Sequence, residues 1–353
     1  MPPLLRHTAL ALALILATSG SATAAFNRDV AQCLEQQSQR APFRGFVTAR
    51  SGTERFEHAM GFADAQDTRP ITRDTPFRLA SVGKVFTRVA VGLLIGEGKV
   101  RLDDPIRRHL PELPESFAAI TVRQLVAHRS GVSPMTRPDM ADGPAMAAAT
   151  TARDLVQVVA SKPLGFEPGS QEQYSNGGYL LLGAVIEATS GKPYREYVAR
   201  HVFDAVGMPH SGFEPGADAA TPLTRLTAPG QPPAATPQPR IEFPALKASA
   251  AGDALSSASD LEALAERLIG DDLLTTPTKA ALFPRGTSHW QLGQAGGSVG
   301  SNTGFWVYPE ANAWLIVLSN IDPPSADLVS EALKPVVLGG ACSLQAPKAM
   351  PPR

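Results

Sequence analysis

The sequence predicts an α+β fold of the α/β sandwich type, in which both ends of the chain build one antiparallel sheet. Residues 45–63 show the pattern of strands, and the strand pattern returns over 289–320. The stretch between them, about 81–284, is mostly helix and loop. Helical patterns also precede the first strands, at 27–40, and follow the last, at about 325–338. This order predicts a sheet flanked by helices with a helical region inserted.

Composition limits the kinds of partner. The 353 residues are 43% hydrophobic and 18% charged, and 32 Lys and Arg nearly balance 33 Asp and Glu. No basic run is present, so we expect neither nucleic acid nor an anionic membrane as a partner. The seven histidines are scattered, without an H-E-x-x-H motif or a Cys/His cluster. We therefore expect no metal and no cofactor.

The first 24 residues are typical of a secretory signal peptide. The basic pair Arg6-His7 precedes an apolar run over 9–17 and the small residues Ala22-Thr23-Ala24. That apolar run is too short to cross a membrane. We expect cleavage after Ala24, export to the periplasm or the medium, and no membrane span in the mature chain.

The mature chain is expected to form a single domain over residues 25–343. Its α/β part would comprise about 25–80 and 285–343, its helical part about 81–284, and residues 344–353 would form a flexible tail. Within 45–63, Ser51-Gly52-Thr53 is predicted to join two strands. Three late strands are expected within residues 289–295, 303–309 and 313–320, followed by the last helix.

The helix predicted after Ser81 is apolar nearly all round. Its apolar positions follow helical spacing at Phe86, Val89, Ala90, Leu93 and Leu94, and Gly96 and Gly98 end it. A helix of this kind should be central and buried.

The two cysteines lie near opposite ends of the mature chain. If the early strands pair with the late ones, the first and last helices lie side by side on the outer face of the sheet. Cys33 would then come within bridging reach of Cys342. We expect a disulfide, with two unrelated buried thiols as the alternative.

Ser81 is the only serine followed by a lysine three positions later, at Lys84. Helical spacing puts the two side chains on one face. A serine at a helix start lies among free backbone N–H groups, whereas burial and the helix dipole lower the pKa of a lysine there. The pair is therefore a candidate nucleophile and base. A capping serine with an exposed lysine is the alternative, which the apolar surroundings of Lys84 weaken.

Two further segments fit such a site. Tyr174-Ser175-Asn176 is the only Y-x-N and precedes a helix that ends at Gly191. By itself, it could equally be a helix cap and a packing tyrosine. The segment 293–297, Gly-Gln-Ala-Gly-Gly, follows a predicted strand and could supply an oxyanion-binding amide.

These segments together resemble the serine β-lactamase and penicillin-binding-protein superfamily. The resemblance is to the branch with class C β-lactamases, D-alanyl-D-alanine carboxypeptidases and related esterases, and it runs from about residue 42 to 320. It rests on an ordered series of segments, among them RLASVGKVFT, ITVRQLVAHRSGV, EPGSQEQYSNGGYLLLGAVIEATSGKPY and GFWVYPEANAWLIVLSN. The family motif S-x-x-K falls on Ser81 and Lys84, and Y-x-N on Tyr174 and Asn176. The third motif, usually Lys or His followed by any residue and Gly, falls on 294–296 and departs from the pattern at Gln294.

The resemblance implies an exported serine hydrolase that acts through an acyl-enzyme at Ser81. Lys84 and Tyr174 would be the general base and acid, and which of them takes the proton is left open. The N–H groups of Ser81 and Gly297 would form the oxyanion hole. Asn176, Gln294 and Gly296 would contact the substrate, a β-lactam, a D-amino acid peptide or a small ester.

Two other interpretations concern a different nucleophile and a different function. Gly296 to Gly300 match a G-x-S-x-G nucleophile elbow at Ser298, but a strand pattern follows and His289 is the last histidine, so the α/β-hydrolase interpretation fails. The alternative function is a catalytically weak or inactive protein that binds a peptide or cell-wall fragment without turnover. His128 is interpreted as a structural hydrogen-bonding residue.

Overall fold

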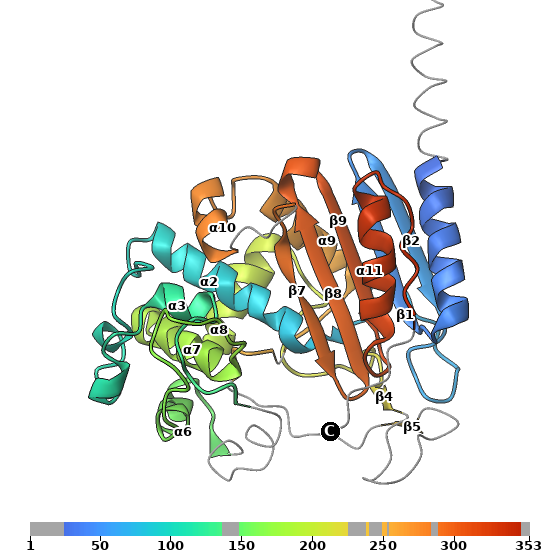
Figure 1. Cartoon of the computed structure of the whole chain (residues 1–353). Coiled ribbons are helices and arrows are strands. Elements are labelled where there is room, and N and C mark those ends of the chain that lie inside the picture. Colours follow the sequence, from blue (N-terminus) through green and yellow to red (C-terminus); the bar gives the residue numbers. More distant parts are fainter. Residues whose placement is uncertain are drawn as a thin grey trace, which may run out of the picture.

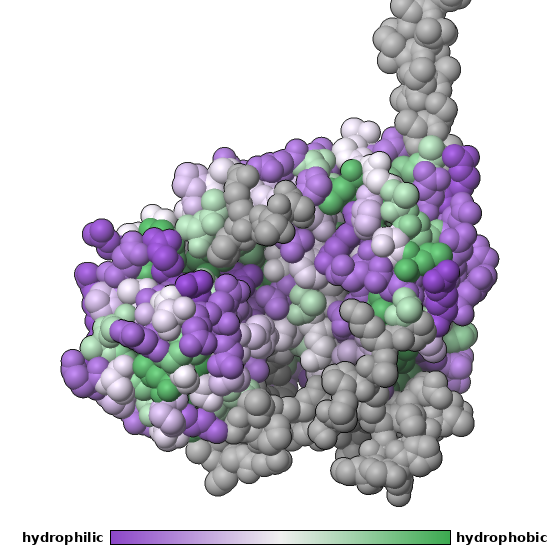
Figure 2. Space-filling model, in the orientation of Figure 1, coloured by the Kyte–Doolittle hydropathy of each residue, from purple (hydrophilic) through white to green (hydrophobic). Residues whose placement is uncertain are grey.

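A computed structural model describes residues 25–135, 148–224, 238–239, 249–252, 254–283 and 289–346. The predicted signal peptide therefore lies outside the described residues. Among the residues described, no helix is both long and apolar enough to cross a membrane. On the face shown in Figure 2, hydrophilic residues cover much of the coloured surface, with hydrophobic residues in smaller patches among them.

One five-stranded antiparallel sheet joins the two ends of the chain (Figure 1). Its order is β2 (Glu54–Met60), β1 (Gly45–Ser51), β9 (Ala313–Ser319), β8 (Ser301–Tyr308) and β7 (Leu292–Ser298). In the register of the central pair, β1 and β9, Val47 faces Val317. The predicted early hairpin and late strands are all present, so the prediction of an α+β sheet assembled from both ends is confirmed.

The central strands are buried because helices cover both faces of the sheet. The N-terminal helix, residues 25–40, and α11 (Ser325–Val337) lie on the outer face, as Figure 1 shows in blue and red. Alternate residues of β9 belong to two separate apolar cores: Leu315 and Val317 pack on the outer side, and Ile316 and Leu318 on the inner side. Successive side chains of a strand point to opposite faces, so this apolar strand contributes residues to both cores.

The inner core holds the helical region. Its central helix, α2 (Lys84–Gly96), packs against α7 (Asn176–Ser190) and α10 (Thr276–Leu282). Smaller helical elements surround them: α3 (Val122–Val126), α6 (Val156–Ala160), α8 (Tyr194–Val198) and the π-helical turn Ala199–Asp204. Most of α2 is buried, as its apolar sequence predicts.

One helix of the predicted helical part packs on the sheet. The helix α9 (Ala258–Ile269) contacts β1, β8 and β9 on the inner face. Thr48 of β1 donates a hydrogen bond of 2.6 Å to Glu262 of α9. The helix is amphipathic, with Leu261, Leu264 and Leu268 fully buried, so it covers the face of the sheet that the outer helices leave open.

The chain ends are tied together on the outer face. Cys33 of the N-terminal helix and Cys342 form a disulfide, with their Cα atoms 5.6 Å apart. Next to it the side-chain oxygen of Gln37 accepts a 2.8 Å hydrogen bond from the backbone N–H of Gln345. Gln345, the second residue of the predicted flexible tail 344–353, is thus held by the N-terminal helix. Residues 347–353 lie outside the described residues.

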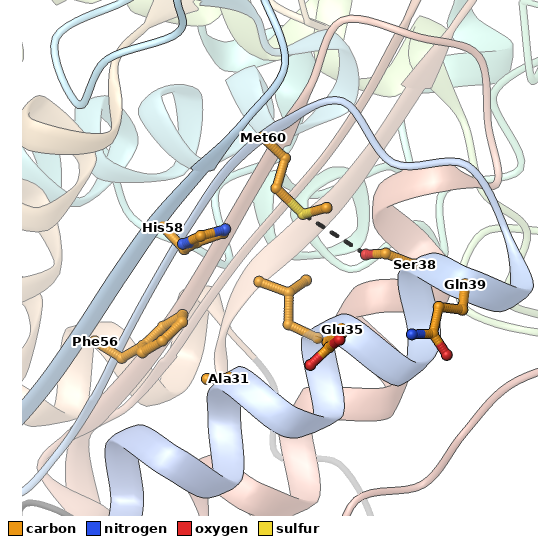
Figure 3. A pocket seen from close by; sticks show the side chains of 8 residues that line it. Ala31, Glu35, Ser38, Gln39, Phe56, His58 and Met60 are labelled. Carbon is orange, nitrogen blue, oxygen red and sulfur yellow. Dashed lines mark hydrogen bonds between the residues drawn. The ribbon is translucent and has the colours of Figure 1, made fainter.

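A shallow groove of about 430 Å³ lies at the sheet edge formed by β2 (Figure 3). Residues of the N-terminal helix and of β2 line it, among them Glu35, Ser38, Phe56, His58 and Met60. The opposite edge of the sheet is β7, which packs against the 3-10 turn that carries Ser81. The groove is therefore separate from the predicted site.

Candidate active site

Ser81 lies on the 3-10 turn Ala80–Gly83, immediately before α2. The sequence placed it in the first turn of that helix, and the structure places it one turn earlier. Ala80 has a φ of +46°, a left-handed conformation that is rare outside glycine. Such strained residues gather at functional sites, and here the strain adjoins the predicted nucleophile.

Lys84 begins α2, and its side chain is fully buried. Its Nζ donates a 2.8 Å hydrogen bond to Oδ1 of Asn176 and a further one to the carbonyl oxygen of Ala251. The same nitrogen lies 3.3 Å from Oγ of Ser81. Burial, reinforced by the positive charge of Arg88, lowers the pKa of Lys84 well below its ordinary value of 10.5. The amine is therefore suited to the neutral form.

Tyr174 reaches Ser81 from the loop before α7. Its hydroxyl lies 2.7 Å from Oγ of Ser81, and 42% of the residue is exposed. Desolvation raises the pKa of Tyr174 to about 12, so the hydroxyl keeps its proton at neutral pH. Ser175 caps α7 by accepting the backbone N–H of Gly178, which fixes the residues on either side of it.

His128 supports this loop from behind. Its Nδ1 accepts the backbone N–H of Ser175 at 3.1 Å, and its ring lies 4.7 Å from that of Tyr174 and 5.0 Å from that of Tyr179. Desolvation, followed by the positive charge of Arg88, lowers the pKa of His128 to about 3, so the ring is neutral. A structural hydrogen bond is the role that the sequence predicted for it.

The edge strand β7 packs directly on the turn that carries Ser81. A Cβ atom at Gly296 would lie 2.2 Å from the carbonyl oxygen of Leu79, so only glycine permits this approach. Gly297 is the next residue on the strand, beside the turn. Gln294 lies two residues before Gly296 and is half-buried. Side chains two residues apart on a strand share a face, so Gln294 points to the same side of the sheet as Gly296.

The rival serine lies in a different setting. Ser298 is the last residue of β7 and is followed by a tight turn and strand β8. A nucleophile elbow needs a helix after the serine, so the structure does not support that interpretation. In the described part of the chain, no group of three or more His, Cys, Asp or Glu side chains is arranged to hold a metal ion.

The family follows from comparison with known proteins. Residues 26–335 match the family model described as Beta-lactamase. The chain belongs to the beta-lactamase family. Family membership confirms the resemblance seen in the sequence motifs.

Relatives in this family carry several activities in their names. The chain is 35% identical over 181 residues to esterase EstB of Burkholderia gladioli, a match covering 47% of this chain and 46% of the esterase. It is 31% identical over 177 residues to penicillin-binding protein 4* of Bacillus subtilis, covering 49% of this chain and 39% of that protein. The matches thus span less than half the length of these curated relatives.

A solved structure extends the likeness to most of the fold. D-amino acid amidase from Ochrobactrum anthropi SV3, complexed with D-phenylalanine, superimposes with a TM-score of 0.70 at 25% identity. That match covers 84% of this chain and 92% of the amidase. The beta-lactamase-family fold is therefore shared almost throughout.

Three contributors to the site were not predicted from the sequence. The Ala251 carbonyl accepts from Lys84, and a Cβ atom at Gly252 would lie 2.4 Å from the carbonyl oxygen of Ala80, so this loop seals the base of the site. Nothing local in the sequence marks a main-chain acceptor. Arg88 was detectable, because it is the only charged residue of α2 besides Lys84.

Proposed function

We propose that this protein is a serine hydrolase that forms an acyl-enzyme at Ser81 and hydrolyses a neutral ester or amide. The observation that carries the proposal is the contact of Ser81 Oγ with two groups of opposite acid–base character. A buried amine lies 3.3 Å away and an exposed phenol 2.7 Å away. Nucleophilic catalysis by serine needs such an activating neighbour.

The hydrogen bonds of Lys84 favour it as the base. A neutral amine has two N–H groups and one lone pair. Asn176 Oδ1 and the Ala251 carbonyl are both acceptors only, so they occupy the two N–H groups. The lone pair then faces Ser81 Oγ and takes its proton as that oxygen attacks the substrate carbonyl.

Tyr174 would act as the acid. Its pKa of about 12 keeps it protonated, and its hydroxyl lies on the exposed side of Ser81, where the leaving group departs. It gives its proton to the leaving alcohol or amine. Lys84 then passes the proton that it took from Ser81 to Tyr174. Lys84, neutral again, then takes a proton from a water molecule whose oxygen attacks the acyl carbon, and Ser81 Oγ receives that proton as it leaves.

The N–H groups of Ser81 and Gly297 would hold the oxyanion. The close approach of Gly296 to the Ser81 turn supports this assignment, because Gly297 is the next residue on that strand. Each donor in such a hole contributes about 3 to 4 kcal/mol to stabilisation of the transition state.

Gln294 favours a neutral substrate. The family pattern has a cation at this position, and an amide hydrogen-bonds a carbonyl without supplying charge. The named activities of relatives, an esterase and a D-amino acid amidase, point to the same class. Export by the predicted signal peptide would add D-amino acid peptides of the cell wall to the candidates.

A substrate panel tests the proposal. Purified mature protein and its Ser81→Ala variant are assayed with p-nitrophenyl esters, D-amino acid amides, a D-Ala-D-Ala peptide and nitrocefin. We expect turnover of esters or amides that disappears in Ser81→Ala. Folded wild-type protein that binds these compounds without turnover would instead support the non-catalytic alternative.

A further inference from the structure

Arg88 is a buried cation one helical turn beyond Lys84. The residue is 8% exposed, and the i, i+4 spacing puts both side chains on the same face of α2. Its Nε donates a 2.5 Å hydrogen bond to the hydroxyl of Tyr179, and its guanidinium lies 5.1 Å from the ring centre of Phe283. No carboxylate pairs with Arg88 in the part of the chain that the structure describes.

An unpaired buried cation is costly, and packing alone would not need one. An apolar side chain of similar length would fill the space between Tyr179 and Phe283 without desolvating a charge. The guanidinium also remains charged at every physiological pH. Lys84 is the only other ionisable group of α2, and the fixed charge of Arg88 disfavours a second positive charge on that amine.

We propose that Arg88 is a positioning residue of the active site, whose fixed charge keeps the Lys84 amine unprotonated and able to take the Ser81 proton. This inference rests on the proposed function. A positive charge on Lys84 would lie one helical turn from that of Arg88 in a buried setting, where charges interact more strongly than in water. Arg88 thereby assigns the role of base to Lys84 and leaves Tyr174 as the acid.

The other groups around the pair do not offset this charge. The segment leading into α7 and α7 itself contribute the phenols of Tyr174 and Tyr179, whose ring centres lie 4.8 and 5.4 Å from Lys84 Nζ. The turn after α3 contributes His128, which is neutral. The loop 249–252 contributes carbonyl groups. Phe283, the residue that follows α10, contributes its ring. None of these described groups carries a negative charge at neutral pH.

The test is the pH dependence of Ser81 labelling by a fluorophosphonate in the full mature chain. Arg88→Met and Arg88→Gln both remove the charge, the second while keeping a polar side chain. For Arg88→Met we expect the acid limb of the rate profile to move upward by about one pH unit or more. The rate near neutral pH then falls about tenfold and recovers in alkaline solution. Arg88→Gln should move the limb to the same extent.

A purely structural role would give a different result. It would lower the labelling rate by the same factor at every pH and leave the limb unmoved, and this would overturn the inference. Arg88→Gln repeats the test with a polar side chain, in case Arg88→Met does not fold. If Ser81 of the wild type is labelled but the acid limb does not move in the neutral variants, only the role of Arg88 is rejected. Absence of labelling in folded wild type rejects the proposed function with it.

Discussion

The hydroxyl of Tyr174 lies 2.7 Å from Oγ of Ser81, although 93 residues separate the two in the chain. On the other side of the same oxygen lies Lys84, fully buried, whereas Tyr174 is 42% exposed. The site therefore has a direction: the amine is on the protein side of the nucleophile and the phenol is on the solvent side. A substrate entering from solvent meets Tyr174 and Ser81 first.

Removing the Tyr174 hydroxyl should affect catalysis and not stability. We expect Tyr174→Phe to lower kcat by about 10²-fold or more, because the leaving group loses its proton donor. The melting temperature should stay close to that of the wild type, since the change removes one hydroxyl from a residue that is 42% exposed and leaves its ring in place. Tyr197→Phe is the matched control, because its buried hydroxyl has no hydrogen-bond partner among the described residues. Equal losses in both variants would contradict the role of Tyr174.

Activity should depend on pH through the two neighbours of Ser81. Only the neutral Lys84 amine accepts a proton, so kcat/KM should rise as pH increases through the lowered pKa of Lys84 and level off well below 10.5. It should fall again only as Tyr174 loses its proton near 12. A pH profile with a substrate whose own ionisation is constant measures both limbs. An acid limb near 10.5 would show that Lys84 is an ordinary lysine.

Gln294 should set the preference for substrate charge. A hydrogen bond to a charged group contributes about 1.5 to 3 kcal/mol, against roughly 1 for a neutral pair. Gln294→Lys should therefore raise kcat/KM for carboxylate-bearing substrates about tenfold and leave neutral esters nearly unchanged. Gln294→Met separates the effect of charge from that of size. An unchanged ratio of anionic to neutral kcat/KM in Gln294→Lys would mean that the side chain does not face the substrate.

The Cys33–Cys342 disulfide should stabilise the fold without affecting the chemistry. It closes a loop with a sequence separation of 309 residues, far from Ser81 on the other face of the sheet. The chain-entropy estimate for a loop this long is about 6 kcal/mol, so Cys33→Ala with Cys342→Ala should lower the denaturation midpoint and leave kcat unchanged. Thiol titration of unfolded, non-reduced protein should find no free thiol. Two free thiols would contradict the bridge.

The sheet and the central helix could be predicted from the sequence because their signals are local. The continuous apolar run of β9 marks a strand buried on both faces, and the apolar surround of α2 marks a buried helix. That early and late strands share one sheet followed from the order of strands and helices, whereas the pairing of β1 with β9 appears only in the structure. The place of α9 could not be predicted, because an amphipathic helix does not show in its sequence which apolar surface it will cover.

The site divides in the same way. Ser81, Lys84, Tyr174 and Asn176 carry side chains whose types and spacing indicate chemistry, and the structure brings all four together. The carbonyl of Ala251 contributes through the main chain, which every residue possesses, so its role appears only in three dimensions. The turn at Ser81 is likewise set by packing against Gly252 and Gly296, and this placed the serine one turn earlier than helical periodicity predicts.

The central claim is covalent chemistry at Ser81, and labelling of the mature protein with a fluorophosphonate measures it most directly. Peptide mass spectrometry should find one modified residue, Ser81. The label should be lost in Ser81→Ala, strongly reduced in Lys84→Met and retained in Ser298→Ala. Modification of Ser298, or no modification in a sample shown to be folded, would contradict the account.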